Sequence, residues 1–197
     1  MRKLLGVLSY LCFIAVFGIF LYEQVKDGFE YLAIPLDYGA VEIFIVYLLN
    51  LIKTPILIVV CLVGIKFLAQ KNNKGYGYLV SFVTLYGLFW FLQKLLEIIY
   101  DGRMAGRWSF ESWEQYLFLF VTLIMTFCGA IAYMSRENNK KQSNLAAFAA
   151  FFVLLASNVL LFLLSHNSAF STLRLIIGTV GTIFGMGVFA LPILGKE

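Results

Sequence analysis

The chain has 197 residues, of which 61% are hydrophobic and 13% are charged, and its mean hydropathy is +0.88. This composition excludes an ordinary water-soluble domain, which covers an apolar core with a charged surface. The formal net charge of +4 does not indicate a nucleic-acid-binding protein, because the basic residues form short clusters between apolar runs, as topology signals do.

Six apolar runs are each long enough to cross a hydrocarbon core of about 30 Å as a helix. Helices are expected because lipid cannot satisfy exposed backbone amides, and the runs lack the alternating polarity of barrel strands. The sequence therefore predicts an all-α, polytopic integral membrane protein with a single transmembrane domain over residues 1–197. The predicted helices cover residues 4–22, 43–65, 76–96, 116–134, 145–164 and 175–194.

The first run follows Arg2 and Lys3, as the apolar core of a secretory signal would. The run is longer than a usual signal core, and Ile19, Phe20 and Leu21 are bulky where a cleavage site needs small residues. We therefore expect this segment to be retained as a membrane helix.

The second run contains the first candidate for a functional residue. Lys53 lies deep inside this run, with Asn50 one turn before it and Pro55 two residues after it. A charged side chain near the bilayer middle is costly, and a proline frees a backbone carbonyl that can face a polar partner. Lys53 and Asn50 are therefore predicted to bind a ligand or an ion. The alternative is that Lys53 has a purely structural role.

The third run carries Lys94 and Glu97 near its end, at a spacing that places both on one helix face. Glu97 is a candidate partner for Lys53, because the short connection between the second and third runs indicates neighbouring helices. The interpretation that we favour for Lys94 and Glu97 is a structural ion pair, or side chains that extend to the outer interface.

Two of the connections are long. One joins the first predicted helix to the second, and the other joins the third to the fourth. The connection over residues 23–42 is expected to lie on the membrane surface or over the bundle. The connection over residues 101–115 contains Trp108, Phe110 and Trp113, which are typical of an interfacial aromatic belt. The favoured interpretation is membrane anchoring, and the alternative is an external lid over a ligand pocket.

The last two runs are rich in small residues. Gly181 and Gly185 have the spacing of a close helix-packing motif, which predicts packing within the chain or a homo-oligomeric contact. Asn158 is a polar residue at mid-depth in the fifth run, where an amide can bridge helices or line a cavity. We include it among the candidate ligand-binding residues.

The sequence gives no indication of a metal, a cofactor or catalysis. The three cysteines lie singly in apolar runs, and His166 has no second ligand near it in the sequence. Motifs of hydrolases, metalloproteases and nucleotide-binding proteins are missing. The prediction is that the protein is not an enzyme and that it has no catalytic residue, metal site or cofactor.

Connections rich in basic residues alternate along the chain with connections of mixed charge. This alternation predicts the orientation of the chain. The positive-inside rule places both termini in the cytoplasm and describes a multi-pass protein of the cell membrane. The basic residues on the predicted cytoplasmic side are Arg2, Lys3, Lys66, Lys71, Lys74, Arg136, Lys140, Lys141 and Lys196.

Two classes of function fit these features. The first is a small transport or permeation subunit that binds a solute or ion around Lys53; without a nucleotide-binding motif, any ATP-driven cycle would need a partner protein. The second is an accessory or regulatory subunit that binds and modulates another protein complex. The predicted partners are the lipid bilayer and either another protein or further copies of this chain.

Overall fold

The computed structural model describes residues 1–32, 41–104, 113–164 and 169–195. These residues form six α-helices and no strand, and all six helices are long and apolar enough to span a membrane. The predicted all-α bundle of six membrane helices is therefore confirmed. The helices are α1 (Arg2–Leu32), α2 (Val41–Ala69), α3 (Lys74–Met104), α4 (Trp113–Met134), α5 (Lys140–Leu164) and α6 (Ala169–Ile193).

All six helices extend beyond the predicted apolar runs at one end or both, and α1 and α3 extend furthest. α1 continues to Leu32 and α3 to Met104, so each helix includes the first part of a segment that the sequence analysis treated as a connection, from residues 23 and 101. Hydropathy locates the apolar part of a helix, whereas helical backbone bonding continues into polar sequence. The parts of these connections over residues 33–40 and 105–112 lie outside the described residues.

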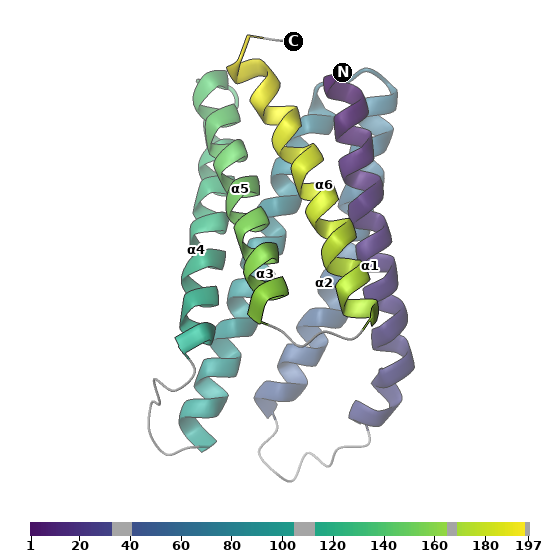
Figure 1. The fold of residues 1–197 in the computed structure, drawn as a ribbon, viewed down its shortest axis with the longest axis vertical. Helices are drawn as coiled ribbons and strands as arrows, with labels where there is room; N and C mark the ends of the chain where they lie inside the picture. The colour runs from purple at the N-terminus through teal and green to yellow at the C-terminus, as the bar shows by residue number, and fades with distance from the viewer. Residues whose placement is uncertain (33–40, 105–112, 165–168, 196–197) are drawn as a thin grey trace.

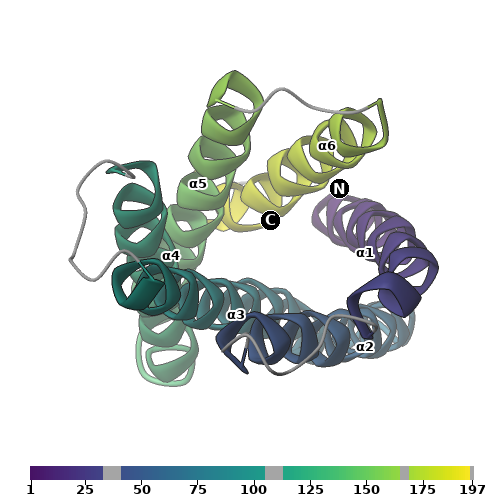
Figure 2. The same ribbon diagram turned by 90° about the horizontal axis from the view of Figure 1, so that it is seen from below.

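The helices form a ring in chain order. Each helix packs against the next one, and α6 packs against α1, which closes the ring (Figure 2). The N-terminus and the C-terminal part of the chain lie at the same end of the bundle, as six crossings require (Figure 1). We call this the terminus end and the opposite end the loop end. That the terminus end faces the cytoplasm stays a prediction.

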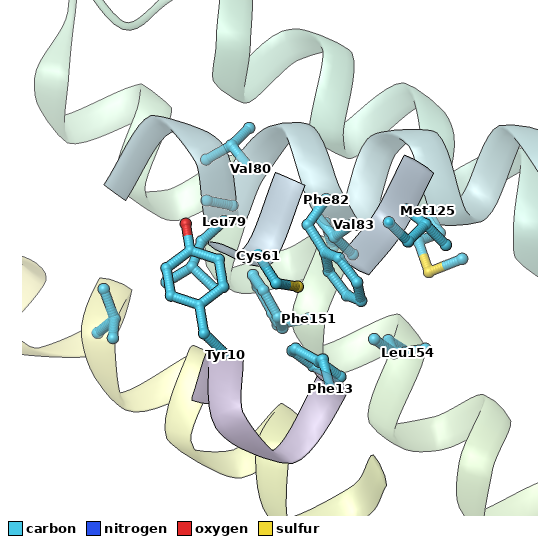
Figure 3. Packing of buried hydrophobic residues seen from close by; sticks show 14 of the residues in the cluster. Tyr10, Phe13, Cys61, Leu79, Val80, Phe82, Val83, Met125, Phe151 and Leu154 are labelled. Carbon is cyan, nitrogen blue, oxygen red and sulfur yellow. The ribbon is translucent and has the colours of Figure 1, made fainter. Parts of the chain in front are cut away.

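Aromatic side chains from several helices pack together with aliphatic ones in the core of the bundle (Figure 3). Phe13 of α1 stacks on Phe82 of α3 with ring centroids 4.3 Å apart, and on Phe151 of α5 at 6.4 Å. Nearer the terminus end, the buried Tyr10 hydroxyl donates a hydrogen bond of 2.7 Å to the Gly75 carbonyl at the start of α3. Because these rings come from helices that are not neighbours in the ring, they close its centre at this level.

The glycines of α6 allow this helix to approach both of its neighbours. A Cβ at Gly181 would lie 2.7 Å from Cβ of Cys12 on α1, and one at Gly185 would lie 2.5 Å from a ring carbon of Phe151 on α5. The Ser9 hydroxyl of α1 also donates to the Gly181 carbonyl at 2.7 Å. The glycine pair is therefore used for packing within the chain, and a homo-oligomeric contact stays a prediction.

Candidate functional site

Lys53 lies on the inner side of α2 and is only 6% exposed. Its ammonium group donates to Oδ1 of Asn50, one turn earlier, at 2.7 Å and to Oε1 of Gln93 on α3 at 2.8 Å. An ammonium has three N–H donors, so these two neutral acceptors leave one donor for a further ligand. Among the described residues, no carboxylate forms an ion pair with Lys53.

The ring of Phe20 on α1 is close to both Lys53 and a second cation. Nζ of Lys53 is 5.4 Å from the centroid of the Phe20 ring, and Cζ of Arg174 on α6 is 5.1 Å from it. Both distances are in the range where a cation is attracted to the ring. Arg174 also forms an ion pair with Glu23 of α1. Helices α1, α2, α3 and α6 thus meet around two positive charges.

An inner cavity of about 300 Å³ lies beside these two cations. Lys53 and Arg174 are its charged lining residues, and no described carboxylate lines it. α5 and α6, which both contribute to the wall, separate toward the loop end (Figures 1 and 2). The remaining lining residues are mostly apolar or aromatic: Phe13, Val16, Phe17, Phe20, Phe82, Tyr86, Leu154, Asn158, Leu161, Leu175 and Gly178.

A second, outer cavity of about 390 Å³ shares part of its wall with the inner one. The shared residues are Phe20, Lys53, Tyr86 and Leu161. Its other lining residues are more polar and comprise Asn50, Trp90, Gln93, Lys94, Glu114, Gln115 and Phe118. Lys53 therefore lies where a polar cavity adjoins an apolar one.

Lys94 and Glu97 form an ion pair on one face of α3, as their spacing favours. With Glu97 bound in this way, the polar contact of Lys53 on α3 is Gln93 and not Glu97. Gln93 is 5% exposed and lies one position before Lys94, on the side of α3 that faces α2. Lys94 also lines the outer cavity, whereas Glu97 does not.

The other predicted residues are distributed differently. Asn158 is 8% exposed and lines the inner cavity, so the structure brings it to the same cavity as Lys53. Trp113 is the first residue of α4 and is 56% exposed, which fits an interfacial position better than a pocket wall. Trp108 and Phe110 lie outside the described residues.

Three contributors to the site were missed in the sequence analysis: Gln93, Arg174 and Phe20. Arg174 directly precedes the sixth predicted helix of residues 175–194, but it lies inside α6, which begins at Ala169. The available signal was the placement of Arg174 and Glu23 at the same end of two apolar runs, where opposite charges can pair. Phe20 gave no signal, because phenylalanine is common throughout this chain.

The chemistry of the arrangement suits the binding of an anion. A buried cation with neutral hydrogen-bond partners, as Lys53 is, keeps its attraction for a negative charge, and low-dielectric surroundings strengthen this attraction. The apolar wall can take a hydrocarbon or aromatic body. Among the described residues there is no group of three or more His, Cys, Asp or Glu side chains that could hold a metal ion.

Comparison with protein families, curated proteins and solved structures finds no match for this chain. The function is therefore inferred from the chemistry of the site.

Proposed function

We propose that the protein is a small transport or permeation subunit that binds a small amphipathic organic anion in the inner cavity. The charged group of this ligand, such as a carboxylate, is bound by Lys53 and Arg174. Its apolar body lies against Phe13, Phe82 and Leu154. The observation that carries the proposal is the position of Lys53, which is buried at the cavity wall with two neutral acceptors and no carboxylate ion pair among the described residues.

The cost of burying a charge supports a ligand-binding role for Lys53. An ammonium inside a membrane bundle needs compensation from hydrogen bonds or from an opposite charge, and such residues mark ligand and ion pathways in membrane proteins. Arg174 has Glu23 as its counter-ion, and Lys94 has Glu97. Lys53 differs from both, because no ion pair among the described residues includes it.

The cavity volume limits the size of the ligand. A volume of about 300 Å³ is at the lower end of the range for small-molecule pockets. The polar outer cavity, which adjoins Lys53, provides a route from the loop end. The aromatic core around Phe13, Phe82 and Phe151 closes the inner cavity on the side of the terminus end. Release of the ligand toward that end therefore requires a rearrangement of the helices.

The experiment is a search for co-purifying small molecules by native mass spectrometry of the detergent-solubilised protein. We expect the wild type to carry an organic anion and Lys53→Leu to be inserted and folded but free of it. Lys66→Gln is the matched control, because Lys66 lies exposed in the last turn of the same helix. If wild type and Lys53→Leu carry the same protein partner and neither carries a small molecule, the accessory-subunit alternative is correct.

A further inference from the structure

A groove between α3 and α4 lies at the terminus end, away from Lys53. Its volume is about 650 Å³, and it is lined by Lys74, Gly77, Tyr78, Ser81, Tyr133, Met134, Arg136, Glu137 and Asn138. The apolar spans of α3 and α4 have their ends at Lys74 and Met134. The groove therefore lies at the boundary between hydrocarbon and polar surroundings, where lipid headgroups are found.

Arg136 is fixed at the wall of this groove. Its Nη2 donates a hydrogen bond of 3.1 Å to the backbone carbonyl of Asn73, in the turn before α3. Its guanidinium lies against Gly77, since a Cβ at that position would be only 1.7 Å from Nη1. A glycine at position 77 is thus what makes room for the arginine. A guanidinium held in one place can bind two oxygens of a phosphate with parallel N–H donors.

The charges around the groove favour an anion. Lys74 is exposed beside Arg136. Lys71 in the turn before α3, and Lys140 and Lys141 at the start of α5, are exposed as well. The described lining contains two cations, Lys74 and Arg136, and one carboxylate, Glu137, so its net charge is +1. Basic surfaces at this level of a membrane attract anionic lipids.

The groove also offers contacts for the apolar part of a lipid. Tyr133 is 60% exposed and Met134 is 78% exposed at the end of α4. Tyrosine is typical of the membrane interface, because its ring contacts acyl chains while its hydroxyl contacts headgroups. A soluble phosphate would make no use of these two side chains.

We propose that this groove binds the phosphate headgroup of an anionic phospholipid, with Arg136 and Lys74 on the phosphate and with Tyr133 and Met134 beside the acyl chains. This site is independent of the inner cavity and of the ligand proposed for it.

The test uses nanodiscs that contain equal amounts of phosphatidylglycerol and phosphatidylcholine, with native mass spectrometry of the lipids retained by the released protein. Wild type is expected to retain mainly phosphatidylglycerol. Arg136→Gln and Lys74→Gln are each expected to lower this preference several-fold. Lys74 is exposed, so its replacement leaves the fold intact.

The Gly77→Ala variant distinguishes lipid binding at a defined site from non-specific attraction of anionic lipids by the surrounding positive charge. This variant keeps every charge but moves the flexible end of Arg136, and it is expected to lower the preference as much as Arg136→Gln does. Gly18→Ala is the matched control, because nothing lies within 4 Å of a Cβ at that helical glycine. Wild-type preference in Gly77→Ala, or in Arg136→Gln, would overturn the proposal.

Discussion

Lys53 of α2 and Gln93 of α3 are joined by a hydrogen bond of 2.8 Å between Nζ and Oε1. Both residues are buried, at 6% and 5% exposure. This bond ties together two consecutive helices of the ring and orients the ammonium toward the cavities. The proposed site depends on this orientation, and the contact can be tested separately from ligand binding.

Gln93→Leu should destabilise the protein by about 1–3 kcal/mol, because it leaves a donor of a buried ammonium without its acceptor. Adding Lys53→Met to this variant should recover part of the loss. The expected coupling is about 1 kcal/mol, the scale of hydrogen bonds between membrane helices. Thermal unfolding in detergent measures all four members of the cycle, and strictly additive effects would show that the two side chains do not interact.

Arg174 and Glu23 should affect anion binding in opposite directions. Arg174→Gln removes a positive charge from the cavity wall and should weaken binding by about tenfold, which corresponds to about 1.4 kcal/mol. Glu23→Gln removes the counter-ion of Arg174 and should strengthen binding. Both affinities can be measured by titration calorimetry with the anion identified by co-purification. Weaker binding in both variants would mean that the pair acts only by joining α1 to α6.

Gly178→Leu should block the inner cavity without unfolding the protein. Gly178 lines the cavity, and a Cβ there would make only ordinary contacts at 3.8 Å with Asn158 and Val16. Gly178→Ala should therefore bind normally, whereas the leucine side chain extends into the space that the ligand needs. The measurement is ligand binding together with the melting temperature. Normal binding by the leucine variant would place the ligand elsewhere.

Gly185→Leu should lower stability by about 1–3 kcal/mol through overpacking against Phe151. Gly18→Leu is the control, since the space around Gly18 is open. Thermal unfolding and native mass should be recorded together. A change in oligomeric state with an unchanged melting temperature would assign Gly185 to a contact between copies of the chain.

Much of the fold follows from local sequence. Each membrane helix corresponds to one apolar run, because the requirement for internal backbone hydrogen bonds in lipid leaves no other structure. The extensions of α1 and α3 could not be predicted in this way, because they lie in polar sequence where hydropathy gives no helical signal. The order of helices around the ring also depends on contacts between distant segments.

The site was predictable in part. The depth of Lys53 in an apolar run pointed to it, and the spacing of Lys94 and Glu97 pointed to their pair. The Arg174–Glu23 pair joins residues 151 positions apart, and no local pattern connects them. The approach of Lys53 and Arg174 to the Phe20 ring arises only when α1, α2 and α6 are packed together.

The most direct test of the proposed function compares the binding of octanoate and of the neutral octanamide to purified wild type and to Lys53→Leu. Wild type should bind the carboxylate at least tenfold more tightly than the amide, and Lys53→Leu should lose this preference while it stays folded. Equal preference for the carboxylate in both proteins would contradict the assignment of Lys53 as the anion-binding residue.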